Sequence, residues 1–166
     1  MAVNLYFHGW FDKDNVENVP TTHGIYIAHG VKWTNSTKTE FQLVQLVYIG
    51  KAEGTNNLRK RIKEHIDGTD KKQNNRIWMW KLKSMNKDVD DILYCYAEKD
   101  VNNLDDIETA LIYANEDNGI FNDRDTHGHT NDRAKALEVH NYEDKGRLLD
   151  HMPERTTINY TSIFGN

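Results

Sequence analysis

The sequence predicts an α+β domain: a small antiparallel β-sheet, made of a hairpin plus a further strand, flanked by helices. Two runs rich in strand-forming residues, at 24–29 and 41–50, are separated by a polar, turn-rich segment, so we expect a hairpin with a long loop. A third such run, at 91–99, lies between segments with helical spacing. This order, β-β-α-(α)-β-α, favours an α+β domain over a doubly wound sheet.

The hairpin strands and the helix after them have clear patterns. The first strand begins at Gly24, after a loop that contains a proline, and the second ends on Gly50. The segment 56–66 repeats an apolar residue at every fourth position and is polar elsewhere. That spacing is typical of a helix with one narrow buried stripe.

The later elements are predicted from weaker signals, with one exception. The segment 76–85 fits neither period cleanly and is assigned as a helix, whereas 91–99 is a strand by composition. The exception is the helix at 103–116, with apolar residues at helical spacing, two acidic residues in its first turn and Asn103 as N-cap. A short helix at 132–140 and a late strand in "ERTTINYTSIF" are also expected.

Length and composition indicate one domain over 1–166. The chain has 166 residues, 37% of them hydrophobic, and its four Trp, eight Tyr and five Phe are not typical of a disordered chain. No apolar run is long enough to cross a bilayer, and the first residues lack the pattern of a secretory signal. The single Cys95 cannot form an internal disulfide. These features favour a cytoplasmic protein.

Positive charge is concentrated in one segment. The chain has a net charge of −5, yet 51–87 contains eleven Lys or Arg against four Asp or Glu, a local charge of +7. A basic segment in an acidic protein is typical of phosphate binding, and a solvated helical face is the alternative. The side chains expected to bind nucleic acid are Lys51, Arg59, Lys60 and Lys63.

Five side chains lie where chemistry could occur. Tyr26 and Tyr48 sit at the centres of the two paired strands, so we expect both on the face opposite their aliphatic neighbours. Arg61 and His65 are four residues apart and share one helical face at the rim of the buried side. Glu108 flanks the apolar stripe of its helix, as either a surface group or a metal ligand aimed at a cleft.

These residues stand within motifs that resemble the GIY-YIG nuclease superfamily. The motifs are "GIY" at 24–26, "YIG" at 48–50, "LRKRIKEH" and "IETALI", in that order. The superfamily includes homing endonuclease catalytic domains, the nuclease half of the bacterial excision-repair incision subunit and several restriction enzymes. The resemblance covers about 18–122, which leaves an N-terminal extension at 1–17 and a C-terminal extension at 123–166.

Two assignments within the resemblance stay open. Arg61 matches the arginine of the family because it stands four residues before the histidine, and Arg59 is the alternative. Asn122 resembles the late asparagine of the family, with Asn118 as the competitor because the usual preceding proline is absent. The hairpin loop is longer than in compact members, and "EGT" at 53–55 looks like an insertion. Neither departure removes a chemical group, so an active enzyme is expected.

The resemblance implies a metal-dependent endonuclease that hydrolyses phosphodiester bonds of DNA, with RNA as an alternative substrate. One Mg²⁺ or Mn²⁺ would be held by Glu108, and Arg61 would contact the scissile phosphate. Tyr26 would be the general base, Tyr48 would orient the water, and His65 would bond to Tyr26 or to the phosphate. Because the reference pKa of a phenol is about 10, the base needs nearby positive charge.

The main alternative is a regulatory or nucleic-acid-binding domain that keeps this fold without cleaving. The sequence shows no separate DNA-reading module, such as zinc-ligand spacing or a helix-turn-helix. Specificity would then come from the loops at 30–41 and 123–150, from a partner subunit or from a homodimer.

Overall fold

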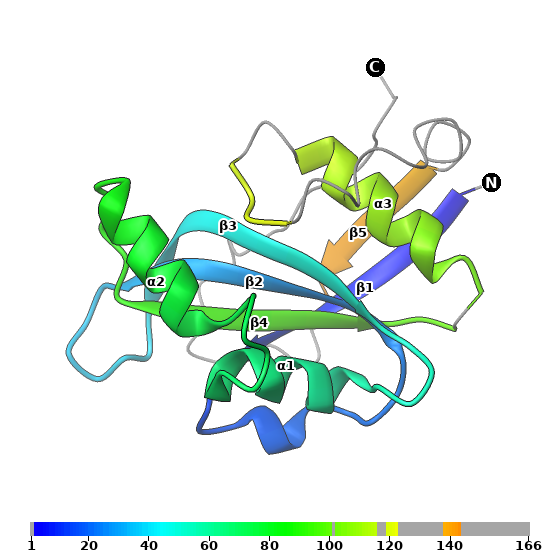
Figure 1. The fold of residues 1–166 in the computed structure, drawn as a ribbon, viewed down its shortest axis with the longest axis horizontal. Coiled ribbons are helices and arrows are strands. Elements are labelled where there is room, and N and C mark those ends of the chain that lie inside the picture. The colour runs from blue at the N-terminus through cyan, green and yellow to red at the C-terminus, as the bar shows by residue number, and fades with distance from the viewer. Residues whose placement is uncertain (1, 101, 116–118, 123–137, 144–166) are drawn as a thin grey trace.

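The structure, a computed structural model, describes residues 2–100, 102–115, 119–122 and 138–143. Its strands pair in the order β3-β2-β4-β1-β5 to form one sheet (Figure 1). The elements are β1 (Ala2–Phe11), a 3-10 turn η1 (Val16–Asn18), β2 (Gly24–Trp33), β3 (Phe41–Ala52), α1 (Leu58–Asp67), α2 (Asn75–Ser84), β4 (Asp91–Glu98), α3 (Leu104–Asn115) and β5 (Glu138–Glu143). None of the helices in this described part is long and apolar enough to cross a membrane.

The predicted α+β class and hairpin are confirmed. Strands β2 and β3 pair antiparallel along their full length, from Gly24 opposite Ala52 to Trp33 opposite Phe41. Strand β4 pairs antiparallel with the other side of β2. The ambiguous segment at 76–85 is indeed a helix, because α2 is capped by the Asn74 side chain and buries two apolar side chains one turn apart. All three predicted helices before residue 116 are therefore present.

The N-terminal extension is part of the sheet, which the sequence prediction missed. Strand β1 pairs antiparallel with β4, with His8 opposite Tyr96. Its residues Val3, Leu5 and Phe7 alternate with polar or exposed positions and are buried. That period of two is the pattern of a strand with one face on the core.

The sheet is also not purely antiparallel. Strand β5 pairs parallel with β1, from Ala2 opposite Glu138 to Phe7 opposite Glu143. The prediction of a helix at 132–140 is wrong for its last three residues, which belong to β5, because pairing with β1 overrides the local helical pattern. The rest of that segment, the loop region at 123–137 and the tail strand in "ERTTINYTSIF" lie outside the described residues.

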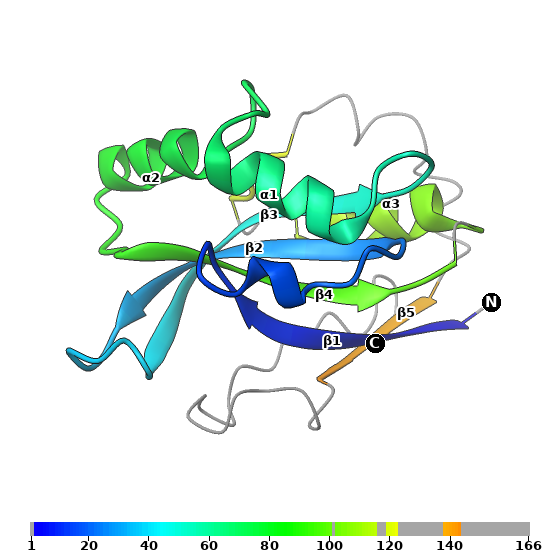
Figure 2. The ribbon, with the colours of Figure 1, turned by 90° about the horizontal axis from the view of Figure 1, so that it is seen from below.

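Helices cover both faces of the sheet and make two cores. Helix α3 packs its apolar stripe, with Ile107 and Leu111, against the face that carries Ile25 and Ile27. Helices α1 and α2 follow one another along one side of the sheet (Figure 2). They bury a second set of side chains against the opposite face, among them Ile62, Trp78, Leu82, Tyr26 and Tyr94.

The two tyrosines lie on this second face, with one deviation from the predicted alternation. Tyr26 and Tyr48 pack in the core under α1 and α2, whereas Ile49 faces α3 as expected. Val47 shares the side of Tyr48, although simple alternation places it opposite. A bulge in the β2–β3 pairing at this point shifts the register by one residue.

Candidate functional site

The centre of the site is a hydrogen bond between β2 and α1. The Tyr26 hydroxyl oxygen lies 2.7 Å from Nε2 of His65, and the Nδ1 atom of His65 lies 2.7 Å from the carbonyl oxygen of Gln73. Because a carbonyl oxygen only accepts hydrogen bonds, Nδ1 carries the ring proton, and the neutral imidazole accepts at Nε2. The hydroxyl of Tyr26 therefore donates to His65.

Burial sets the protonation of this pair. Both side chains are fully buried. Burial lowers the pKa of His65 below its usual value, and the nearby Arg61 guanidinium lowers it further, so the ring is neutral at neutral pH. Burial also raises the pKa of Tyr26 well above its ordinary value, with Tyr48 adding to the increase and Arg61 opposing it. This direction is opposite to the lowered pKa that a phenolate base needs, so a proton leaving Tyr26 needs the acceptor that His65 provides.

The position of the Tyr26 ring requires a glycine at residue 50, the last residue of "YIG". Gly50 stands directly opposite Tyr26 in the β2–β3 pairing, and a Cβ atom on Gly50 would lie 2.3 Å from Cζ of the tyrosine. A Cβ on Gly24, the glycine of "GIY", would lie 2.0 Å from the carbonyl oxygen of Ala97 on β4. Both glycines therefore permit a close approach that any side chain would block.

Tyr48 and Trp78 extend the aromatic side of the site. The ring of Tyr48 is centred 5.3 Å from His65 and 6.3 Å from Tyr26. It stacks on Trp78 of α2 at 5.1 Å, and the indole of Trp78 is centred 5.2 Å from the His65 ring. Stacked and tilted rings at these distances attract one another, so they fix the orientation of the imidazole.

Arg61 lies beside the Tyr26 hydroxyl and is held by two carboxylates. Its guanidinium interacts with the phenol oxygen, forms an ion pair with Glu64 and places Nη2 3.5 Å from Oδ2 of Asp70. The side chain of Arg61 is 22% exposed. A phosphate that reaches this guanidinium has to compete with Glu64 and Asp70 for it.

Glu108 is a buried carboxylate of α3. It is 8% exposed, and among the described residues none forms a hydrogen bond or an ion pair with it. Burial raises its pKa to about 7, with Lys51 and Arg61 acting in the opposite direction. The charge of Glu108 also acts on Tyr26 and Lys51, although α3 packs against the other face of the sheet from Tyr26.

This carboxylate fits a divalent cation. Mg²⁺ and Mn²⁺ prefer oxygen ligands and keep several waters, so one buried carboxylate with no competing donor can suffice. In the part of the chain that the structure describes, no group of three or more His, Cys, Asp and Glu side chains converges as a complete protein cage. Glu108 would therefore be the protein ligand in the described region, with water and phosphate oxygens completing the shell.

Asn122 lies against β3 and not at the Tyr26–His65 pair. Its Oδ1 accepts a hydrogen bond from the Ile49 amide at 3.1 Å, and its Nδ2 donates to the Ile49 carbonyl at 2.6 Å. The side chain thus pairs with β3 as a neighbouring strand would, and it fixes the backbone between Tyr48 and Gly50. Asn122 is a positioning residue in this geometry. Its competitor Asn118 lies outside the described residues.

The four side chains predicted to bind nucleic acid provide little free charge. Lys51, Arg59 and Lys63 each lie next to acidic side chains of the same chain. The partners are Glu53 and Asp105 for Lys51, and Glu17 for both Arg59 and Lys63. Lys60 is exposed and pairs with no described carboxylate. Most of the charge on α1 is therefore neutralised within the chain.

Gln73, in the connection between α1 and α2, is a site residue that sequence reasoning missed. Besides its carbonyl contact with His65, its Oε1 accepts from Nε1 of Trp78 at 2.7 Å. Its Nε2 donates to the carbonyl oxygen of Phe121 at 3.1 Å. Gln73 thus links α1, α2 and the segment that carries Asn122. A polar run such as "DKKQNN" contains no periodic signal that marks one residue as buried.

The structure brings four of the six candidate catalytic side chains together on one face of the sheet, namely Tyr26, Tyr48, Arg61 and His65. Glu108 comes from α3, which packs against the other face, and it is linked to these four through its electrostatic effect on Tyr26. Asn122 lies in the segment after α3 and bonds to the backbone of β3. The resemblance to GIY-YIG nucleases rests on the sequence motifs that contain these residues. Comparisons with protein-family models, with curated proteins and with solved structures find no match for this chain.

Proposed function

We propose that this protein is a metal-dependent endonuclease that hydrolyses phosphodiester bonds of DNA. The observation that supports this most directly is the 2.7 Å hydrogen bond from Tyr26 to His65, with Arg61 beside it and the buried Glu108 close enough for its charge to act on Tyr26. Hydrolysis needs a route for the proton of the attacking water and positive charge near the phosphoryl oxygens. These side chains include a group for each need.

The Tyr26–His65 pair would move the proton. Tyr26 already donates to Nε2 of a neutral imidazole, so His65 can accept the phenol proton as the phenol oxygen takes one from water. The hydrogen bond from Nδ1 to Gln73 holds the required tautomer. Asp70, whose Oδ2 lies 4.0 Å from Nδ1, would stabilise the imidazolium that forms.

Arg61 would hold the phosphate. Its guanidinium can bind two phosphate oxygens once it leaves Glu64 and Asp70. Tyr26 is fully buried, so the same rearrangement has to expose its hydroxyl to the attacking water. Movement of the half-buried Arg61 side chain, which interacts with that hydroxyl, is the simplest way to do so.

Glu108 would hold one Mg²⁺ or Mn²⁺. When bound, such an ion supplies positive charge at the phosphate and lowers the pKa of coordinated water. The carboxylate has to be ionised to act as a ligand, and its pKa of about 7 makes occupancy depend on pH near neutrality.

A second candidate function is a domain of this fold that binds nucleic acid without cleaving it. The complete burial of Tyr26 and the raised pKa of its hydroxyl favour this alternative. It needs neither proton transfer nor a cation at Glu108.

Cleavage of supercoiled plasmid in Mn²⁺, Mg²⁺ or EDTA tests the proposal. We expect nicking with either cation, none in EDTA, and none by Glu108→Gln. Glu40→Gln is the matched control, because Glu40 is an exposed carboxylate at the hairpin loop, and it should nick like the parent. Nicking by highly purified Glu108→Gln would remove Glu108 from the mechanism. Binding without nicking under every cation condition would favour the second candidate.

A further inference from the structure

Among the described residues, most of the unpaired positive charge of the basic segment lies on α2 and the connection before it, with Lys60 of α1 as an exception. Residues 68–87 contain six Lys or Arg and one acidic residue, Asp70, which pairs with Arg61. Among the described side chains, no carboxylate forms an ion pair with Lys71, Arg76 or Lys83. This contrasts with α1, where most cations have acidic partners. The phosphate-binding charge predicted from the sequence is therefore centred away from α1.

A single exposed indole stands within this charge. Arg76, Trp80 and Lys83 have the spacing i, i+4 and i+7, which places them on one face of α2. Trp80 is 70% exposed, whereas Trp78 and Leu82 on the opposite side of the helix are fully buried. One exposed apolar side chain is common on a protein surface, so Trp80 indicates a ligand only in combination with the cations on the same face.

The same face borders a hollow. A cavity of about 590 Å³ lies between the end of α1 and the start of α2, and its lining includes Ile66, Lys71, Arg76, Ile77 and Trp80. The lining combines these apolar side chains with the two cations, and it also contains Asn74 and one carboxylate, Asp67. Apolar surface beside cations suits the flat face of a base next to its phosphates.

We propose that this Trp80 surface, formed by Lys71, Arg76, Trp80 and Lys83, binds a single strand of nucleic acid. Trp80 would stack on an unpaired base, and the three cations would contact the neighbouring phosphates. A single-stranded nucleic acid offers base faces to the indole and phosphates to the unpaired cations, so it accounts for both features. A protein partner with ordinary surface composition does not account for this combination.

The surface adjoins the candidate site and deepens the proposed function, on which it rests. Trp78 stacks on Tyr48 from the inner side of α2, so the Trp80 surface is one helix diameter, about 10 Å, from the Tyr26–His65 pair. A strand that passes from Arg61 over α2 would thus meet Trp80 within a few nucleotides. The substrate class would then be DNA with a single-stranded segment beside the scissile phosphate.

Binding of a labelled oligodeoxythymidylate of about 12 nucleotides, measured in EDTA, tests this surface apart from cleavage. We expect Trp80→Ala to weaken binding roughly 5- to 150-fold and Trp80→Phe to restore much of it, because base stacking needs an aromatic face. Trp80 is the one strongly exposed tryptophan of the described residues, so the oligonucleotide should also quench parent fluorescence far more than Trp80→Phe fluorescence.

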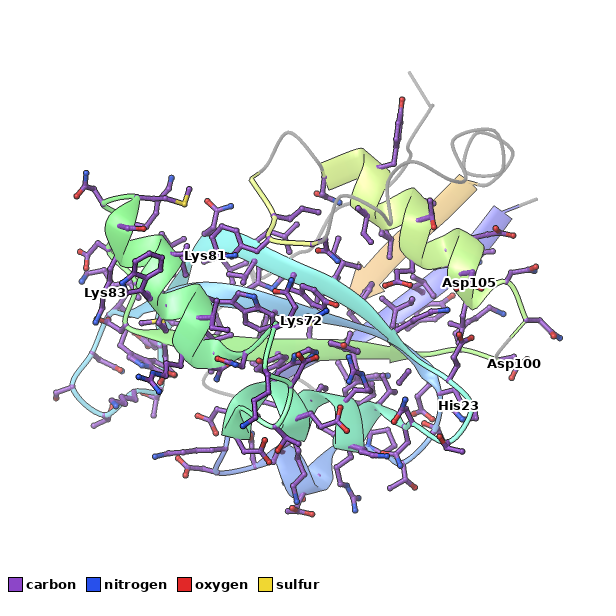
Figure 3. The ribbon with its side chains drawn as sticks, in the orientation of Figure 1. His23, Lys72, Lys81, Lys83, Asp100 and Asp105 are labelled. Atoms are coloured by element: carbon purple, nitrogen blue, oxygen red, sulfur yellow. The ribbon has the colours of Figure 1, made fainter. Side chains whose placement is uncertain are left out.

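Charge reversal at the two ends of the sheet provides the matched control. Figure 3 places Lys83 on α2, at the opposite end of the sheet from Asp100. Lys83→Glu should weaken binding and lower the salt slope by about 0.7 or more for each phosphate that the lysine neutralises in the parent. Lys99→Glu, beside Asp100, should bind like the parent. Circular dichroism confirms that each variant is folded.

The outcomes separate this inference from the proposed function. If binding depends on Trp80 but the protein never cleaves DNA, the Trp80 surface is supported and the proposed nuclease activity is rejected. If the protein cleaves DNA and Trp80→Ala binds the oligonucleotide as well as the parent does, the Trp80 surface is overturned and the proposed nuclease activity stands. A change of oligomeric state in Trp80→Ala, without loss of nucleic-acid binding, overturns the inference and identifies a protein interface instead.

Discussion

The contact between Tyr26 and His65 can be tested by removing one oxygen. Tyr26→Phe leaves Nε2 of His65 without its donor, so we expect a loss of about 1–3 kcal/mol in the free energy of unfolding. The single-turnover cleavage rate should fall by about 10²–10⁴ if the pair carries the proton. Tyr48→Phe should lose less, because the ring that stacks on Trp78 is kept. If Tyr48→Phe is the slower enzyme, the roles of the two phenols are reversed.

The carboxyl group of Glu108 should make stability depend on pH. Its pKa is about 7 in the folded protein against 4.5 as the ordinary value, so the folded state binds the proton more tightly. The stability it contributes is present below pH 4.5 and is lost as pH rises through about 7, a change of about 3 kcal/mol. Urea denaturation of the parent and of Glu108→Gln between pH 4 and 8 measures it. Equal pH profiles for the two proteins would contradict the burial of this carboxyl group.

A cation bound at Glu108 should stabilise the folded protein at high pH, where the carboxyl group alone no longer does so. At pH 8 the carboxylate is ionised, and Mn²⁺ at a hundredfold excess over its Kd should stabilise the folded protein by about 2.7 kcal/mol. Calorimetry of the parent and of Glu108→Gln, each with and without Mn²⁺, checks this without any assay of cleavage. An equal shift in Tm for both proteins would place the ion elsewhere.

At the scale of elements, the close pairing of β2 with β3 depends on Gly50. Gly50→Ala puts a Cβ atom within 2.3 Å of the Tyr26 ring, so the strand or the ring has to move. We expect a loss of about 1–3 kcal/mol, typical of overpacking. Tyr26→Ala removes the ring, so adding Gly50→Ala to that variant should cost little. A double-mutant cycle from urea unfolding measures the difference, and additive losses would show that the two residues do not meet.

Most elements that the sequence predicted have either a regular apolar period or a high density of strand-forming residues, and only α2 was assigned without a clear period. Helices α1 and α3 show their apolar stripes, and β2, β3 and β4 are dense in strand-forming residues. Strand β1 carries an equally regular alternation at Val3, Leu5 and Phe7, but this alternation lies outside the segment 18–122 that contains the motifs. Strand β5 could not be predicted, because its conformation follows from pairing with β1 and not from its own pattern.

The sequence could predict the position of a site residue where that position depends on the geometry of one helix or strand. Arg61 and His65 stand on one turn of α1, and that spacing predicts their shared face. The ion pairs that neutralise the basic segment join residues far apart in the chain, such as Lys63 with Glu17, so no local pattern reveals them. The buried carbonyl of Gln73 belongs to a connection whose path only the folded chain defines.

At the scale of the whole molecule, β1 joins the N-terminal segment to the centre of the sheet. Leu5 is fully buried in the core beneath α3, so Leu5→Ala should lower the free energy of unfolding by about 2–5 kcal/mol. Asn4→Ala is the control, because Asn4 is exposed on the same strand and should change stability by less than about 0.5 kcal/mol. Chemical denaturation of both variants measures this, and a small loss for Leu5→Ala would mean that β1 is dispensable.

The position of β1 has a consequence for how the chain is made. Its antiparallel partner is β4, with His8 opposite Tyr96, so the hairpin, α1 and α2 are all translated between the two strands. On the ribosome β2 and β3 can pair early, whereas β1 has to wait with an unpaired backbone and exposed apolar side chains until β4 emerges. Slow translation through residues 50–90 should therefore promote aggregation of nascent chains, and chaperones that shield strands would act during that interval.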